Sequence, residues 1–288
     1  MKNSKTSDLI LNNIYLLIPL IIYGIFKNGY LIYEKNLINI FMIFKPLYLV
    51  LIGVVIKIVI DFIKYKKIKF DYNLLYVILI GMIVPYNISI LLYSVVFTIS
   101  YLITLFLEKF IKVNKVCLIY LILILVNSLF NDFTFMSILE QKYSYSFDFL
   151  DLIMGRCIGG ISSTSIIFSL IAYTILINNF YYKKDIPFII NITYLGLAIL
   201  YLIITNNINF LLNSELIFAS IFISALPEYS PYKEKNQIIY SILIAIISFI
   251  TSLLFNSIIS IYIATFILSL FQNICIRQNK TKLSIADK

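Results

Sequence analysis

The sequence has no histidine and little charge, and both shortages restrict what the protein can do. Only 13% of the 288 residues are charged, whereas 61% are hydrophobic, and the mean hydropathy is +0.97. A chain of this composition cannot keep most of its surface in water. Histidine is the commonest metal ligand and general base, so its absence removes the usual routes to metal and acid–base catalysis. The composition therefore predicts an integral membrane protein without a conventional catalytic or metal site.

Cysteine is also scarce, and its spacing argues against a metal centre. Cys117, Cys157 and Cys275 are far apart, and each lies in or beside an apolar run. No pair has the spacing of zinc or iron–sulfur ligands, so we expect buried structural thiols. The stretch GRCIGG at 155–160 lacks the preceding strand and the Lys-Ser/Thr ending of a phosphate-binding loop. Its glycines indicate close helix packing or a re-entrant turn.

Apolar runs fill the chain almost from end to end and predict about ten membrane segments. Runs of roughly 17 to 25 residues are long enough to cross a hydrocarbon core about 30 Å thick. The stretch at 149–161 is too short and too polar to span, and is interpreted as re-entrant or interfacial. The expected fold class is therefore all-α, a polytopic integral membrane protein with about ten transmembrane helices. The predicted segments are 10–26, 38–63, 74–87, 88–108, 115–130, 162–179, 187–204, 209–226, 237–255 and 257–275.

Lysine and arginine collect on one side of the membrane in this arrangement. With a cytoplasmic N-terminus, 17 of them fall in inner segments, and three (Lys27, Lys35 and Lys142) fall in outer ones. The positive-inside rule then predicts a multi-pass protein of the cell membrane with both termini in the cytoplasm. Anchoring to the lipid bilayer also accounts for the net charge of +9, so no nucleic-acid partner is expected.

The order of the segments predicts two inverted halves. Five predicted segments precede residue 149, so the second five begin from the outer side. The chain is therefore interpreted as one membrane domain, 1–288, whose inverted five-helix halves lie at about 1–148 and 149–288. Such halves are common in membrane proteins that move ions or solutes.

Ionisable residues inside the predicted segments are the main functional candidates, because a charge in the membrane usually faces protein or water. Lys57 and Asp61 are four residues apart and could pair on one helix face, so they are candidates for an ion pathway. The alternative is a local ion pair with a lysine that reaches toward the interface. Lys45, Arg156 and Glu215 are further candidates, but the sequence does not connect them.

Landmarks along nearly the whole chain occur in the order of a known family. The chain resembles RnfD, a membrane subunit of Rnf-type electron-transport complexes, which is a relative of NqrB from sodium-translocating NADH:quinone reductase. Its first two helices are similar at 18–37 and at FKPLYLVL, 44–51. An acidic residue, a helix, a proline turn and a returning helix follow in DYNLLYVILIGMIVPYN, 71–87. The remaining landmarks are FLDLIMGRCIGGISSTS at 149–165, DIPFIINITYLG at 185–196 and LIFASIFISALPEYSPYKEKN at 216–236.

This resemblance implies a function that the residues alone do not reveal. It implies a membrane subunit of an Rnf-type ion-translocating ferredoxin:NAD oxidoreductase, which couples electron transport to Na⁺ or H⁺ movement. The implied partners are the other membrane and peripheral subunits of such a complex, and the chain is not expected to be catalytic alone. The alternative is a small-solute transporter or channel that uses the same scaffold without redox chemistry.

The resemblance also implies a cofactor site at Thr134. In the family, a threonine in the outer loop after the fifth helix carries FMN through a phosphoester bond that a separate transferase makes. NDFTFMSIL at 131–139 places Thr134 on this acceptor position. The glycine and alanine of the family motif are absent, and Phe133 and Phe135 would crowd both transferase and flavin. The alternative is a threonine in an amphipathic loop at the membrane interface.

Other positions also depart from the family pattern, and these departures likewise indicate the loss of a flavin site. Of the Thr-Asp-Pro that follows the eighth helix in the family, only Pro227 is present, after Ala225 and Leu226. The chain has only eight glycines, the residues that permit close backbone approach to a cofactor. The sequence therefore predicts a divergent member that keeps the scaffold and has an eroded flavin site.

Overall fold

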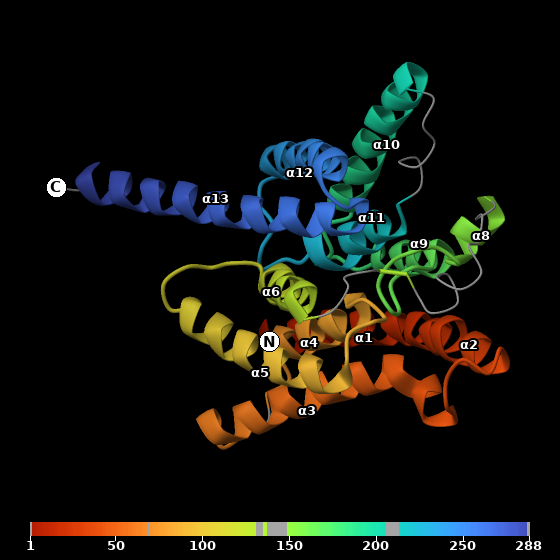
Figure 1. Cartoon of the computed structure of the whole chain (residues 1–288). Helices are drawn as coiled ribbons and strands as arrows, with labels where there is room; N and C mark the ends of the chain where they lie inside the picture. The colour runs from red at the N-terminus through yellow and green to blue at the C-terminus, as the bar shows by residue number, and fades with distance from the viewer. Residues whose placement is uncertain (1, 68, 131–134, 137–148, 206–212, 287–288) are drawn as a thin grey trace.

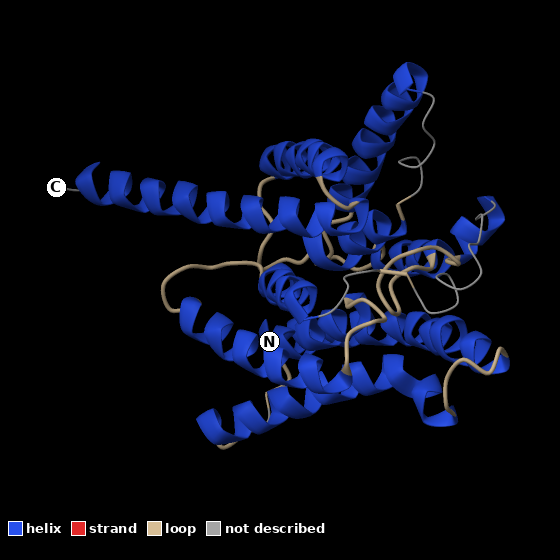
Figure 2. Cartoon of the chain, in the orientation of Figure 1, coloured by secondary structure: helices blue, strands red, loops and turns tan. Residues whose placement is uncertain are grey.

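All regular secondary structure is helical in the part that the computed structural model describes, which comprises residues 2–67, 69–130, 135–136, 149–205 and 213–286 (Figure 2). The helices are α1 (Lys2–Ile25), α2 (Leu31–Glu34), α3 (Lys45–Tyr65), α4 (Tyr72–Ile83), α5 (Ile90–Leu107), α6 (Lys115–Phe130), α8 (Phe149–Met154), α9 (Ile166–Leu176), α10 (Asp185–Thr205), α11 (Ser214–Ala219), α12 (Glu234–Leu254) and α13 (Ser257–Ala286). A π-helical turn, Phe26–Tyr30, joins α1 to α2; a second, Ser220–Ser224, extends α11; and a 3₁₀ turn, Ile40–Phe44, precedes α3.

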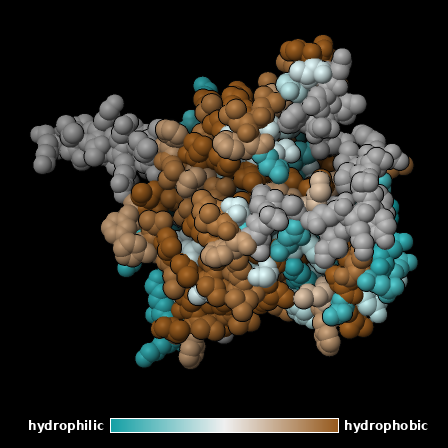
Figure 3. Space-filling view, viewed as in Figure 1, coloured by the Kyte–Doolittle hydropathy of each residue, from teal (hydrophilic) through white to brown (hydrophobic). Residues whose placement is uncertain are grey.

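Five helical stretches are long and apolar enough to cross a membrane, which confirms the expected all-α, polytopic membrane fold. Each has at least 18 residues, a length that suits a hydrocarbon core about 30 Å thick. Apolar side chains cover most of the face shown in Figure 3, and hydrophilic ones gather toward its edges. The five stretches are Asp8–Glu34, Ile40–Tyr65, Ile90–Leu107, Asp185–Thr205 and Glu234–Leu254.

Three of the predicted spans, 74–87, 162–179 and 209–226, are shorter in the structure than expected. α4 has 12 residues and α9 has 11, while α11 and its π-helical turn together cover Ser214–Ser224. A helix of 12 residues is about 18 Å long, so it reaches only part of the way through the membrane. All residues from 75 to 83 in α4 are buried, because longer helices surround it (Figure 1).

Local sequence explains where the short helices begin and end. Val84 precedes Pro85 and takes extended backbone, with ψ of 148°, because the proline ring disfavours a helical residue before it. Ser165 and Asn213 cap α9 and α11, since each side chain accepts a hydrogen bond from the backbone N–H three residues further on. The predicted spans included these non-helical residues and were therefore too long.

Two series of helices follow the same order along the chain. In the series α3 to α6 and α10 to α13, the second helix is short and ends before a proline-bearing turn, at Pro85 and Pro227. The hydrogen-bonded or stacked residues on α6 and α13 show that these helices pack antiparallel, as equivalent helices of inverted halves would. The division at 148–149 stays a prediction. The contacts pair Asn114 with Ser269, Cys117 with Thr265 and Tyr120 with Tyr262.

Close packing of α3 on α4 depends on a glycine. A Cβ atom at Gly81 would lie 2.8 Å from the Cα atom of Val50, a backbone atom that cannot move aside. By contrast, a Cβ atom at Gly196 on α10 would meet nothing within 4 Å. The two glycines therefore differ in packing, although both lie within apolar helices.

We predict that Gly81→Ala destabilises the purified protein by about 1–3 kcal/mol, because the added methyl group forces α3 and α4 apart. Gly196→Ala is the matched control, and should be neutral or stabilise by up to about 1 kcal/mol through helix propensity. Thermal unfolding in detergent would measure both. Equal effects of the two substitutions would contradict the close α3–α4 contact.

Candidate functional site

A buried, non-helical segment between α8 and α9, residues 155–165, forms the floor of the candidate site. The backbone N–H groups of Ile161 and Ser162 donate to the carbonyl oxygens of Val84 and Met82, both at 2.9 Å. These bonds satisfy carbonyl groups that α4 leaves unpaired where it ends. The stretch 149–161, expected to be re-entrant or interfacial, comprises α8 and the first part of this segment, and its position relative to the membrane stays a prediction. The segment 155–165 therefore brings irregular backbone into the protein interior, where its polar groups are paired within the protein.

Glu215, the second residue of α11, is the buried acidic group of this site. Its side chain is fully buried, and three donors surround it. The Gly160 N–H donates to Oε1 at 2.7 Å, and the Ser163 hydroxyl donates to the same oxygen. The Tyr262 hydroxyl donates to Oε2 at 2.5 Å. Because both carboxylate oxygens have donors, the site can hold a negative charge away from water.

Glycines let the segment approach the carboxylate closely. A Cβ atom at Gly159 would lie 2.8 Å from Oε1 of Glu215, and one at Gly160 would lie 2.7 Å from the carbonyl oxygen of Ile83. Gly155 has a φ of +95°, a backbone conformation that side-chain-bearing residues rarely adopt. The glycines of GRCIGG therefore serve close packing and a turn, as expected from the sequence.

Lys27 holds the same segment from the first part of the chain. Its ammonium group donates to the Cys157 carbonyl oxygen and to Oγ1 of Thr164, the latter at 3.4 Å. Next to it, the side-chain amide of Asn28 donates to the Ile161 carbonyl oxygen at 2.7 Å. The first predicted segment ended at residue 26, whereas the helical stretch continues through a π-helical turn to Glu34 and buries Lys27. The outer position of Lys27 stays a prediction. A positive charge thus lies near the buried Glu215.

Lys57 is the centre of a second buried cluster, at the end of α3. Its ammonium nitrogen lies 2.6 Å from Oδ2 of Asp61 and 3.2 Å from Oδ1 of Asp71, and it also donates to the carbonyl oxygen of Lys69. Lys57 is fully buried, whereas the Asp71 side chain is 34% exposed. The predicted pairing of Lys57 with Asp61 is confirmed. Their role in an ion pathway stays a prediction.

Further polar contacts lie next to this cluster, and one of them reaches the turn before α12. Asp71 accepts a hydrogen bond of 2.9 Å from Asn73, and Asn73 accepts one of 2.5 Å from Lys115. The Tyr76 hydroxyl, one turn further along α4, donates to Glu228 in the turn before α12. The sequence did not indicate that residues as far apart along the chain as Tyr76 and Glu228 would lie in contact.

Lys183 lies in the loop between α9 and α10 and contacts the loop that precedes α12. Its ammonium group donates to the carbonyl oxygen of Ser230 at 2.6 Å and to the hydroxyl of Ser230 at 2.7 Å. Burial, which disfavours the charged form, lowers the pKa of Lys183 to about 8. Lys183 was predicted to be an inner anchoring charge, and the structure gives it this additional role in holding the turn after Pro227.

The other charged candidates are separate from Glu215. Arg156 lies on the surface, with its side chain 57% exposed, and pairs with Asp151 at 3.4 Å. Lys45 donates to the Tyr86 carbonyl oxygen at 2.5 Å and lies over the Tyr86 ring. Neither contributes a contact to the buried carboxylate among the described residues.

Thr134, the candidate FMN acceptor, lies outside the described residues. Its neighbour Phe135 is described and is only 3% exposed, within the main hydrophobic core. Cys117 and Cys157 are buried, as expected, whereas the side chain of Cys275 is outside the described part. No group of three or more potential metal ligands occurs in the described ranges.

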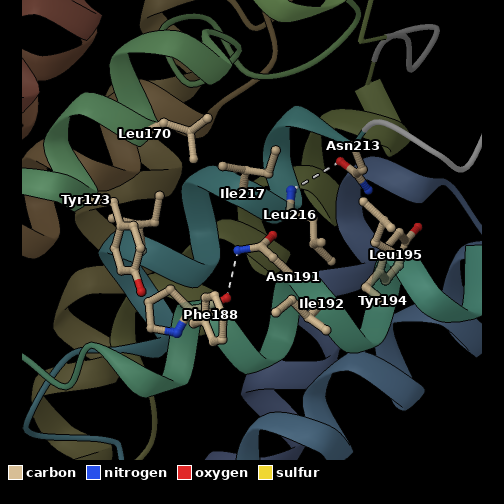
Figure 4. Close-up of a pocket in the computed structure, with 12 residues that line it drawn as sticks. Leu170, Tyr173, Phe188, Asn191, Ile192, Tyr194, Leu195, Asn213, Leu216 and Ile217 are labelled. Atoms are coloured by element: carbon tan, nitrogen blue, oxygen red, sulfur yellow. Dashed lines mark hydrogen bonds between the residues drawn. The ribbon is translucent and has the colours of Figure 1, made fainter. Parts of the chain in front are cut away.

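A cavity of about 180 Å³ lies between α9, α10 and α11 (Figure 4). Asn191 points toward its middle and donates to the Pro187 carbonyl oxygen and to the Ser220 hydroxyl, both at 2.8 Å. The remaining lining is mainly apolar, and Leu216 and Ile217 contribute to it whereas Glu215 does not. The cavity is therefore separate from the buried carboxylate.

Comparison with known proteins identifies one family. The family model described as NQR2, RnfD, RnfE family matches residues 1–277. No curated protein matches the chain. The match covers every element that builds the two clusters, and it agrees with the resemblance that the order of sequence landmarks indicates.

We predict that Lys57→Met destabilises the protein by about 3 kcal/mol, because it leaves two carboxylates without their cation. The matched control is Arg156→Met, which breaks an exposed ion pair and should change stability by less than about 1 kcal/mol. Adding Asp61→Asn to Lys57→Met should recover part of the loss, since it removes one stranded charge. Thermal unfolding in detergent would test the three variants. Equal effects of the two single substitutions would argue against the buried cluster.

Proposed function

The chain belongs to the NQR2, RnfD, RnfE family, and from this premise we propose that it is the RnfD-type membrane component of an Rnf-type ion-translocating ferredoxin:NAD oxidoreductase. At family level, it is a membrane subunit of the Rnf/Nqr type. The proposal adds the electron donor and acceptor, and the coupling of electron transport to H⁺ or Na⁺ movement. It also adds a location in the cell membrane with both termini in the cytoplasm.

The family match over residues 1–277 is the observation that carries this proposal. The buried Glu215 supports its ion-moving part, because an ionisable residue within a membrane protein usually marks an ion pathway, proton relay or ligand site. The short helices α4 and α11 support it as well. Helices that break off inside the membrane are a common means of building ion sites.

The sequence around Thr134 departs from that of a flavin acceptor, because phenylalanines stand at 133 and 135 in place of small neighbours. Of these two, Phe135 is described, and it is buried in the main hydrophobic core. A packed phenylalanine also opposes the extended, accessible segment that a transferase needs. We therefore propose that this subunit contributes scaffolding and ion movement, and that electrons pass through its partner subunits.

The same observation favours a second candidate, a small-solute transporter or channel without redox function. A protein that kept the helical body but lost the flavin site would satisfy both the family match and the burial of Phe135. Partners separate the two candidates, because only the first requires a multisubunit redox complex.

Purification of the tagged chain from its native membranes, at its native level, tests the proposal. We expect the other Rnf-type subunits to purify with it, together with ferredoxin-dependent NAD⁺ reduction that sets up an ion gradient in sealed vesicles. Omitting Na⁺ and adding a protonophore in separate vesicle samples would distinguish Na⁺ from H⁺ coupling. A chain that purifies without redox partners, and that carries a solute across vesicles, would support the second candidate.

We predict that the subunit purified from native membranes has its unmodified mass and shows no flavin fluorescence in a denaturing gel. Thr134→Ala should then change neither the mass beyond the substitution nor the stability by more than about 1 kcal/mol, since it removes one loop hydroxyl. Intact-mass spectrometry would measure both proteins. A mass increase that matches FMN, present in the parent chain and lost in Thr134→Ala, would show that the site is still flavinylated.

A further inference from the structure

A line of buried polar side chains runs from Glu215 along the interface of α6 and α13. We call it the α6–α13 seam, and it comprises three positions on each helix. Every one of its side chains is buried, although the surrounding helices are strongly apolar. The residues are Asn114, Cys117 and Tyr120 at the start and along α6, and Tyr262, Thr265 and Ser269 on α13.

Three contacting residue pairs follow one another along the seam. The Tyr262 hydroxyl donates to Glu215 at 2.5 Å, and the Tyr262 ring lies against that of Tyr120, with centroids 4.2 Å apart. One turn further, Sγ of Cys117 lies 2.9 Å from Oγ1 of Thr265. The seam ends beside Lys115, where the Asn114 N–H donates to the Ser269 hydroxyl at 3.2 Å.

Two polar atoms of the seam have no hydrogen-bond partner within the described residues, namely Oη of Tyr120 and Nδ2 of Asn114. The same holds for Oη of Tyr240, a buried tyrosine of α12 that lies outside the seam but within electrostatic range of Cys117. An unpaired buried polar atom costs about 1–3 kcal/mol, so such atoms usually bind ordered water. These atoms lie beside the phenol, thiol and hydroxyl groups of the seam, and groups of these kinds can pass protons.

Helix adhesion explains only part of this arrangement. Polar pairs hold membrane helices together, and the Ser248–Ser260 pair between α12 and α13 is a local example. The Cys117–Thr265 pair serves the same purpose. Adhesion requires neither the carboxylate at the end of the seam nor the unpaired Tyr120 hydroxyl beside it, and both are costly in the interior.

The donors around Glu215 fit a proton better than a metal cation. The Gly160 N–H occupies Oε1 and cannot bind a cation, and the Lys27 ammonium group contributes positive charge nearby. The other titratable groups that face the site are Tyr262 from α13 and Tyr120 from α6. Cys157, in the segment 155–165, contacts Ser214, the residue before Glu215. A sodium ion would need several free oxygen ligands, which this set does not supply.

We propose that Glu215 takes up and releases a proton, and that the α6–α13 seam conducts this proton between Glu215 and the Lys115 end of α6. Tyr262 passes its hydroxyl proton to Oε2 of Glu215 and receives another in its place. The phenol, thiol and hydroxyl groups of Tyr120, Cys117, Thr265 and Ser269 each gain and lose one proton in turn, whereas Asn114 positions Ser269. The net change is one proton moved, with no redox step. The inference rests on the proposed ion-moving function, and it names H⁺ as the ion at this site.

Infrared difference spectroscopy of the full chain in lipid nanodiscs tests the proposal. When the pH is lowered, the parent protein should develop a carboxylic-acid band that shifts in D₂O, and the nearly isosteric Glu215→Gln should lack this band. Tyr120→Phe should slow exchange of the band with D₂O by about tenfold or more, because it interrupts the proton relay. Tyr120→Phe keeps the ring contact and removes a hydroxyl without a protein partner, so it should fold normally.

Tyr93→Phe is the matched control, because Tyr93 is also buried with an unpaired hydroxyl but lies on α5, away from the seam. It should exchange at the parent rate. The proposal is overturned if the parent protein shows no such band, if the band persists in Glu215→Gln, or if Tyr120→Phe exchanges as fast as Tyr93→Phe. The measurement needs no partner subunit. Its failure would therefore leave the subunit assignment standing, whereas failure of the co-purification would leave the Glu215 result standing.

Discussion

The protein interior provides no water to pair with irregular backbone, and this constraint explains why the segment 155–165 depends on so many partners. Where α4 ends, its carbonyl groups accept hydrogen bonds from Ile161 and Ser162. The segment in turn is held by Lys27 and Asn28, and its Gly160 N–H donates to Glu215. The buried carboxylate is therefore a structural partner of irregular backbone as well as a candidate proton carrier, and the two roles use the same contacts.

The two buried clusters make different use of charge. At the end of α3, Lys57 lies between Asp61 and Asp71, and the network reaches partly exposed groups. Around Glu215, neutral donors predominate and the side chain is fully buried. An ion pair with fixed partners holds helix ends together, whereas a carboxylate with exchangeable hydroxyl donors can change its protonation without breaking the backbone contacts. This difference makes Glu215 the stronger candidate for ion movement.

Local patterns in the sequence predicted much of the fold. Apolar run lengths placed the helices, and the four-residue spacing of Lys57 and Asp61 predicted their pairing. The errors in the predicted helix ends also have local causes, namely the residues that stop, cap or continue a helix. α4, α9 and α11 are shorter than their apolar runs because Pro85, Ser165 and Asn213 set helix ends within them. The first predicted segment ended just before Lys27, because hydropathy does not distinguish a lysine in a loop from one buried by a π-helical turn.

The sequence by itself determined the membrane class, the approximate helix positions and the family, because these depend on composition, on run length and on the order of landmarks. Only the tertiary structure decided which polar residues meet. Glu215 contacts Gly160, Ser163 and Tyr262, and Tyr120 reaches this group only through the antiparallel packing of α6 on α13. Contacts between residues so far apart along the chain depend on how helices cross, and neither hydropathy nor local spacing records that geometry.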